Sequence, residues 1–142
     1  MVIADYFPRL GVNDSEKTSP EADRYNCIAW AAGNDTEWWE PSPDGVWPSD
    51  APYAPTIEAL TRVYASLGYE VCLDGSLETG YEKIAIYGHD GEYEHAARQL
   101  PDGRWTSKLG PNEDIVHVNA ECLTGGIYGE LAHFMKRKCK QK

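Results

Sequence analysis

Residues 95–109 read HAARQLPDGRWTSKL, and this stretch decides the fold class. Two extended runs flank Pro101-Asp102-Gly103, where Asp and Gly readily adopt the dihedral angles of a tight turn. We therefore expect a β-hairpin, in which the numbers of facing residues sum to about 205. His95 then lies near 108–110, and a shift of one or two positions brings it to Ser107. Alternation along the strand puts Ser107 on the same face as Trp105.

The sequence around this hairpin predicts helices first and strands afterwards. Apolar residues of 56–67 follow helical spacing, and a shorter helix is expected over 25–33 with Asn26 as its N-cap. The predicted strands outside the hairpin are Tyr69–Leu73, Lys83–Tyr87 and Ile115–Val118. Residues 127–135 fit either a helix or a strand. This order predicts an α+β fold with N-terminal helices packed on an antiparallel sheet.

Length and composition indicate a single domain over residues 1–142. The chain is 42% hydrophobic and 25% charged, which is ordinary for a globular protein. Residues 1–24 hold many turn-forming residues and predict an irregular lead-in, and the basic residues of 136–142 predict a frayed, solvated tail. Residues 34–55 are too rich in proline for regular structure and predict an ordered aromatic loop.

The net charge of −10 excludes several classes of function. Such a chain repels phosphate backbones, so nucleic-acid binding is not expected. It has no apolar run long enough to span a membrane and no secretory signal at its start, which predicts a cytoplasmic location without membrane attachment. The four cysteines form no CxxC pair, so we expect free thiols, no metal site and no cofactor.

Cys27 is the strongest candidate for a nucleophile. It falls in the first turn of the predicted helix 25–33, where unpaired backbone N–H groups favour a thiolate and can stabilise an oxyanion. His95 opens the first strand of the hairpin and could serve as its base. A third polar group should orient the imidazole. Ser107 is our choice from the hairpin register, with Asp114 and His117 as alternatives.

These residues resemble the papain-like fold, most closely its bacterial NlpC-type branch. Tyr25-Asn26-Cys27 opens a helix, His95-Ala96 opens a strand, and a polar residue follows about a dozen positions later on the next strand. The strings YNCIAWAAG, EKIAIY, HAARQL and WTSKLG also resemble a family of small uncharacterised bacterial proteins. The papain-like resemblance implies a cysteine hydrolase of amidase, peptidase or deamidase type, with Cys27 as nucleophile, His95 as base and Ser107 as the orienting residue.

A hydrolase of this kind requires residues that bind a peptide, amide or protein substrate. Aromatic, basic and amide side chains are the candidates: Asn26, Trp38, Trp39, Trp47, Arg98 and Lys108. Each also has a structural interpretation, since tryptophans under a proline-rich loop can cover the core and cations can pair with the many acids. The alternative function is a non-catalytic acidic protein of the immunity or adaptor kind, which binds a basic protein partner.

Overall fold

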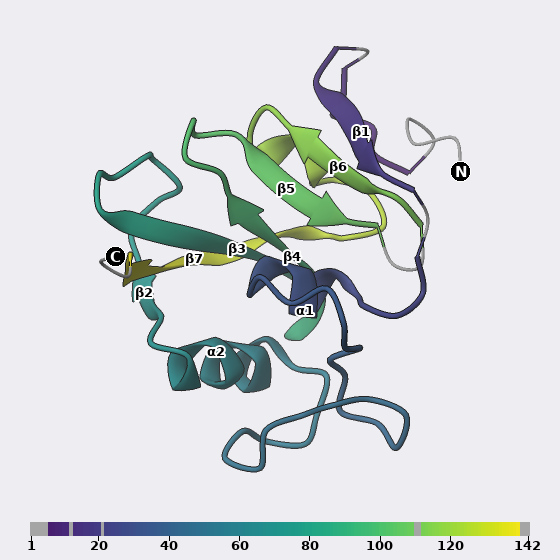
Figure 1. The fold of residues 1–142 in the computed structure, drawn as a ribbon, viewed down its shortest axis with the longest axis vertical. Coiled ribbons are helices and arrows are strands. Elements are labelled where there is room, and N and C mark those ends of the chain that lie inside the picture. Colours follow the sequence, from purple (N-terminus) through teal and green to yellow (C-terminus); the bar gives the residue numbers. More distant parts are fainter. Residues whose placement is uncertain (1–5, 12, 21, 110–111, 140–142) are drawn as a thin grey trace.

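A seven-stranded antiparallel sheet forms the body of the computed structural model, which describes residues 6–11, 13–20, 22–109 and 112–139 (Figure 1). The strands are β1 (Ser15–Ser19), β2 (Glu70–Cys72), β3 (Tyr81–His89), β4 (Glu92–Gln99), β5 (Trp105–Lys108), β6 (Asp114–His117) and β7 (Glu130–Lys138). Their order across the sheet is β1-β6-β5-β4-β3-β7-β2. Two short helices, α1 (Cys27–Ala31) and α2 (Ile57–Ser66), complete an α+β fold.

The predicted hairpin is present as β4 and β5. Gln99 pairs with Trp105, which agrees with the expected register within one position. Gly103 has a φ of 92°, a conformation that favours glycine. Ser107 and Trp105 are both buried and lie on the same face of β5 by strand alternation.

The sheet separates two cores. The helix-side core joins Ile84, Ile86 and Ala96 of the sheet to buried residues of both helices, including Cys27 and Tyr64. The far-side core contains the residues that alternate with them on the strands, together with side chains from the chain ends: Phe7, Ala85, Tyr87, Ala97, Trp105, Leu109, Ile115, Ala120, Cys122, Leu123 and Tyr128. Neighbouring residues of β3 and β4 therefore point into different environments.

Both predicted helices exist and both are capped by side chains. The Asn26 side chain accepts a hydrogen bond from the Ala29 N–H, and Thr56 accepts one from the Ala59 N–H at 3.0 Å. The α2 helix buries Leu60, Val63 and Tyr64, the face that the apolar spacing indicates. The connection between α1 and α2 is irregular, as its prolines predict, and extends beyond the helices in Figure 1.

The sequence predictions at the two ends of the chain were wrong. Residues 1–24 include β1, whose sequence SEKTS pairs with β6 at the edge of the sheet. An edge strand of polar residues carries no hydrophobic signal, because both of its faces are largely exposed. The predicted basic tail begins inside β7: Lys136 bonds Glu78 at 3.0 Å, and Arg137 pairs with Glu82. Residues 140–142 lie outside the described residues.

The segment 127–135, which fitted two templates, is a turn followed by a strand. Gly129 has a φ of 73°, and the chain then enters β7 between β3 and β2. A side chain at Gly129 would meet the Gly88 carbonyl oxygen at 2.3 Å, so this close approach requires glycine.

Candidate active site

Cys27 occupies the first turn of α1, where the sequence placed it. The side chain of Asn26 ties this turn to the aromatic loop: its Oδ1 accepts hydrogen bonds from the N–H groups of Ala29 and Trp39, both at 3.1 Å. Its Nδ2 donates to the Trp39 carbonyl at 2.7 Å. Both polar atoms of Asn26, a predicted substrate-binding residue, are thus engaged within the protein.

The environment of Cys27 does not favour a thiolate in the resting state. Its sulfur lies in the helix-side core with only 9% of the residue exposed. Burial raises the pKa of the thiol to about 11, and the backbone N–H groups of Ala96, Ile28 and Cys27 itself offset only part of that rise. Desolvation therefore outweighs the helix N-terminus, contrary to the expectation from sequence.

His95 lies one residue before Ala96 on β4, and its side chain points to the other face. Its imidazole stacks on the ring of Tyr128 at 3.9 Å with an interplanar angle of 1° and also contacts Tyr87. Nε2 of His95 lies 2.9 Å from the Ser107 hydroxyl oxygen. The hairpin register therefore brings these two predicted residues together.

Ser107 connects His95 to a second histidine. The Ser107 oxygen lies 2.8 Å from Nε2 of His117, and Nδ1 of His117 lies 2.7 Å from the Asn119 carbonyl oxygen. His95, Ser107 and His117 are each fully buried. His117 was an alternative to Ser107 in the sequence analysis, and the structure places both in one hydrogen-bonded chain, the His–Ser–His chain.

The hydrogen-bond partners assign every proton in this chain. A carbonyl only accepts, so Nδ1 of His117 carries a proton and its Nε2 is an acceptor. Ser107 must then donate to His117 and accept from Nε2–H of His95. This leaves Nδ1 of His95 as a bare acceptor, and no group in the described part of the chain donates to it.

Burial keeps both imidazoles neutral. It lowers the pKa of His117 to about 4, although the hydrogen bond with the Asn119 backbone opposes the shift. The pKa of His95 is held well below its ordinary value, first by burial and then by the repulsion that a protonated His117 would exert on a second positive charge. The His–Ser–His chain thus holds a neutral base whose proton-accepting atom is fixed.

Cys27 lies next to the peptide unit that joins His95 to Ala96, but its thiol and the imidazole of His95 are on opposite faces of β4. The Ala96 N–H faces the sulfur from the helix side, whereas the imidazole of the preceding residue lies with Tyr87 and Tyr128 on the far side. Among the described residues, no hydrogen bond joins the sulfur to His95. The structure therefore joins His95 to Ser107 and His117 and keeps the Cys27 thiol apart from them.

The remaining candidate for the third position, Asp114, belongs to the helix side. Its Oδ2 accepts a hydrogen bond from the Tyr25 hydroxyl at 2.7 Å. Lys108 lies over the same tyrosine ring at 5.0 Å and donates to the Ala22 carbonyl at 2.7 Å. Lys108, predicted to bind substrate, is fully buried. Asp114 and Lys108 thus take part in a cluster on the helix side, where the charge of Lys108 also acts on the Cys27 thiol.

Two of the three tryptophans of the aromatic loop cover the helix-side core. Trp39 and Trp47 pack against it, and Trp47 stacks on Tyr93 at 6.2 Å. Trp38 is half-buried and accepts a backbone hydrogen bond from Val46 at 2.8 Å. Beside them lies a pocket of about 210 Å³, lined by Trp39, Trp47, Val63 and Leu67 among others. Trp39 and Trp47 therefore cover the core and also line a hollow.

Sequence reasoning missed two groups at the site. Tyr128 stacks on His95 from a loop far along the chain, and the Ala96 N–H faces the sulfur. No local pattern marks Tyr128, since only the folded topology brings it to β4. The contact between the Ala96 N–H and the sulfur could have been predicted from the sequence. It follows from packing the first turn of the helix against the strand that begins with His95-Ala96.

In the part of the chain that the structure describes, no group of three or more His, Cys, Asp or Glu side chains could hold a metal ion. Among the described residues, no helix combines the length and apolarity needed to cross a bilayer.

Comparison with known proteins identifies the family. No curated protein and no solved structure matches the chain. The profile of a family described as a domain of unknown function, DUF7689, matches residues 16–136, from β1 almost to the end of β7. The chain therefore belongs to the DUF7689 family.

Proposed function

We propose that this protein is a cysteine-dependent acyl hydrolase of papain-like type, acting on an amide or peptide bond. The observation that carries the proposal is the fixed tautomer of His95, whose bare Nδ1 is buried and has no donor among the described residues. A buried acceptor without a partner is costly and calls for a functional explanation. A base that awaits a proton from a thiol is such an explanation.

The reaction begins with a neutral pair. The Cys27 thiol transfers its proton to Nδ1 of His95 as the sulfur attacks the carbonyl carbon, and the carbonyl oxygen becomes an oxyanion. The N–H groups of Ile28 and Ala96 lie around the sulfur and are the nearest donors to the developing negative charge. The imidazolium then returns the proton to the leaving amine, which leaves a thioester on Cys27. Water, deprotonated by His95, hydrolyses the thioester.

The His–Ser–His chain supports this role by holding the imidazole in one orientation. Ser107 and His117 fix the proton on Nε2 of His95, so that Nδ1 remains the accepting atom. Attack requires the sulfur, on the helix side of β4, to come within hydrogen-bonding reach of Nδ1 of His95 on the far side, so the start of β4 must rearrange before the proton is transferred. Because Trp39, Trp47 and Tyr93 cover the helix-side core around Cys27, substrate entry requires the aromatic loop to move.

Acylation by p-nitrophenyl acetate, followed by intact mass and peptide mapping, tests the proposal. Cys27 should gain one acetyl group faster than the exposed Cys139, although Cys139 is the more accessible thiol. His95→Asn should slow acylation of Cys27 by at least about a hundredfold, the usual scale of general-base catalysis. His89→Asn is the matched control, because His89 is exposed and remote from the sulfur. Equal rates in both variants, or modification of Cys139 alone, would refute the proposal.

The pH dependence separates base-assisted attack from simple ionisation. If neutral His95 accepts the proton, the acylation rate stays level from alkaline pH down to well below pH 6.5, where the buried imidazole finally protonates. If the sulfur reacts only as a free thiolate, the rate climbs throughout towards pH 11. The second profile would contradict the proposed mechanism.

A second candidate function is a non-catalytic binding protein. The raised pKa and burial of Cys27 favour it, since a protonated buried thiol is inert. In that case Cys27→Ala leaves the function unchanged, and one basic protein is captured stoichiometrically at low ionic strength. The net charge of −10 supplies the attraction, which salt would weaken.

A further inference from the structure

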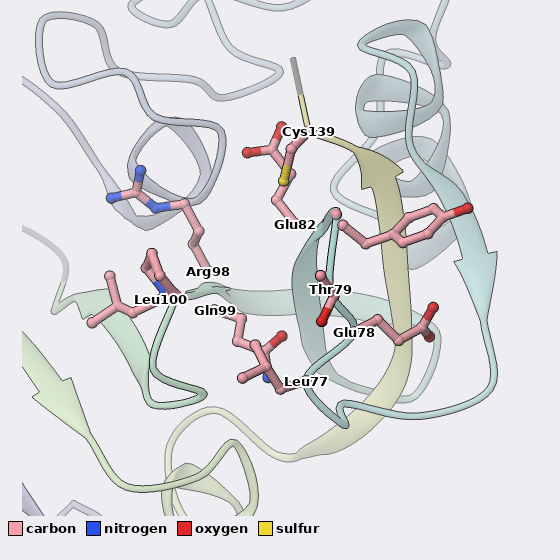
Figure 2. Close-up of a pocket in the computed structure, with 11 residues that line it drawn as sticks. Leu77, Glu78, Thr79, Glu82, Arg98, Gln99, Leu100 and Cys139 are labelled. Carbon is pink, nitrogen blue, oxygen red and sulfur yellow. The ribbon is translucent and has the colours of Figure 1, made fainter. Parts of the chain in front are cut away.

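A pocket of about 500 Å³ lies where β3 begins, β4 ends and the chain leaves β7 (Figure 2). This volume falls within the range of roughly 300–1,000 Å³ typical of small-molecule sites. Its walls are largely apolar and include Leu77, Tyr81, Leu100 and Pro101. The pocket is separate from the His–Ser–His chain, and none of its lining residues belongs to the proposed triad.

Arg98 is the unusual residue of this pocket. Its Nε is buried, and no group in the described part of the chain accepts a hydrogen bond from it. The guanidinium lies 5.1 Å from the centre of the Trp30 ring and forms no ion pair with a described residue. An unpaired, partly buried cation is unfavourable unless something supplies a counter-charge.

The nearby carboxylates act on Arg98 only at a distance: burial lowers the pKa of its guanidinium, Glu82 and Asp114 partly offset that shift, and neither forms an ion pair with it. Glu78 bonds Lys83 and Lys136, each at 3.0 Å, and Glu82 pairs with Arg137. Figure 2 shows Arg98 on one side of the pocket, with Glu82 and Cys139 across from it. The pocket carboxylates therefore form their ion pairs with other cations, and Arg98 lies beside an apolar hollow with no ion pair to a described residue.

We propose that this pocket binds a small organic carboxylate, with its charged end on Arg98 and its apolar body against Leu77, Leu100 and Pro101. A guanidinium suits this ligand because its planar fork can donate two parallel hydrogen bonds to a carboxylate. The apolar walls exclude water from the rest of the ligand and favour a hydrocarbon group. This inference does not depend on the proposed hydrolase activity.

Titration of the whole protein with hexanoate, followed by NMR or calorimetry, tests the assignment. Hexanoate should bind saturably, and the neutral hexanamide should bind at least about tenfold more weakly because it lacks the charge-assisted bonds. Arg98→Gln should weaken hexanoate binding at least about tenfold. Arg62→Gln makes the same charge change on an exposed residue of α2 and should have no effect.

Two further measurements keep the test decisive. Saturating hexanoate should slow alkylation of Cys139, which lies in the pocket wall, without slowing that of Cys72, which does not line the pocket. Cys27→Ser should bind hexanoate normally, which separates this site from the acyl-transfer proposal. Equal binding by Arg98→Gln, an equal loss in Arg62→Gln, or no saturation would overturn the assignment. If Arg98→Gln does not fold, the binding of hexanoate by Arg98→Lys and the protection of Cys139 from alkylation test the assignment in its place.

Discussion

The two faces of β4 show how one strand serves two different environments. On the helix side, Ala96 meets Cys27 in a core of apolar side chains held by packing and by the Asn26 cap. On the far side, His95 enters a chain of buried polar groups in which each hydrogen bond fixes the next. An apolar core loses little stability when a small group is removed. Removing one member of a buried hydrogen-bonded chain leaves the remaining polar groups without partners and costs more. The far side should therefore be the more sensitive to substitution.

Ser107→Ala should have the largest effect on stability. It leaves Nε2–H of His95 without an acceptor and Nε2 of His117 without a donor, and each buried orphan costs about 1–3 kcal/mol. We expect the free energy of unfolding to fall by about 4 kcal/mol. Thr106→Val is the control on the adjacent residue, which faces the helix side, accepts one bond from Trp30 and donates one to the Ile115 carbonyl. It should cost about 1–2 kcal/mol in urea denaturation, and a larger loss there would reverse the comparison.

Lowering the pH should have the second-largest effect on the free energy of unfolding, through the far side of the sheet. Burial lowers the pKa of His117 from 6.5 to about 4, so the unfolded chain binds a proton that the native state excludes. The contribution of His117 is intact above pH 6.5 and is lost as pH falls towards pH 4, amounting to about 3 kcal/mol. The difference in unfolding free energy between pH 7 and pH 4 should shrink in His117→Asn. It should not change in His89→Asn, where the histidine is exposed.

Asn26→Ala tests the helix side and should have an intermediate effect. It removes the cap of α1 and both backbone contacts to Trp39, which together are worth about 2 kcal/mol. Thr56→Ala removes only a cap, that of α2, and should cost about 1 kcal/mol. Asn26→Ala should also speed alkylation of Cys27 by iodoacetamide, because it loosens the aromatic loop. An unchanged labelling rate would show that the loop is held by its tryptophans alone.

Cys122→Ser should have the smallest effect. The Cys122 sulfur donates to the Asn119 carbonyl at 3.1 Å, and a serine hydroxyl can replace that donor at similar size. We expect a change in unfolding free energy below about 1 kcal/mol by thermal denaturation. A larger loss would mean that the contact between the sulfur and His117 at 3.7 Å supports the His–Ser–His chain.

Local signals predicted much of the fold. The helices with their caps, the Pro101-Asp102-Gly103 turn and the antiparallel arrangement all follow from short stretches of sequence. The polar edge strand β1 was not predictable, because nothing in SEKTS distinguishes an edge strand from a loop. The basic residues of β7 were misassigned for a related reason. Their partners Glu78 and Glu82 lie more than fifty positions away, and only the sheet topology brings them together.

The candidate site was predictable only along the hairpin. The register put His95 opposite positions 108–110, within one or two residues of its partner Ser107, and the helix cap placed Cys27 in a first turn. The separation of Cys27 and His95 by the strand depends on which face His95 takes, and a shift of one residue in register reverses that face. The extent of desolvation at Cys27 depends on how closely α1 packs against β4, which the sequence pattern does not determine.

The two ends of the sheet oppose its growth. β1 carries Glu16 and Lys17 among exposed residues, and β2 is only three residues long and begins with Glu70. An incoming strand from another molecule would need to desolvate these charges or find enough length to pair with. Replacing Glu16 and Lys17 by valine or threonine would remove that barrier and turn the β1 edge into a template for aggregation.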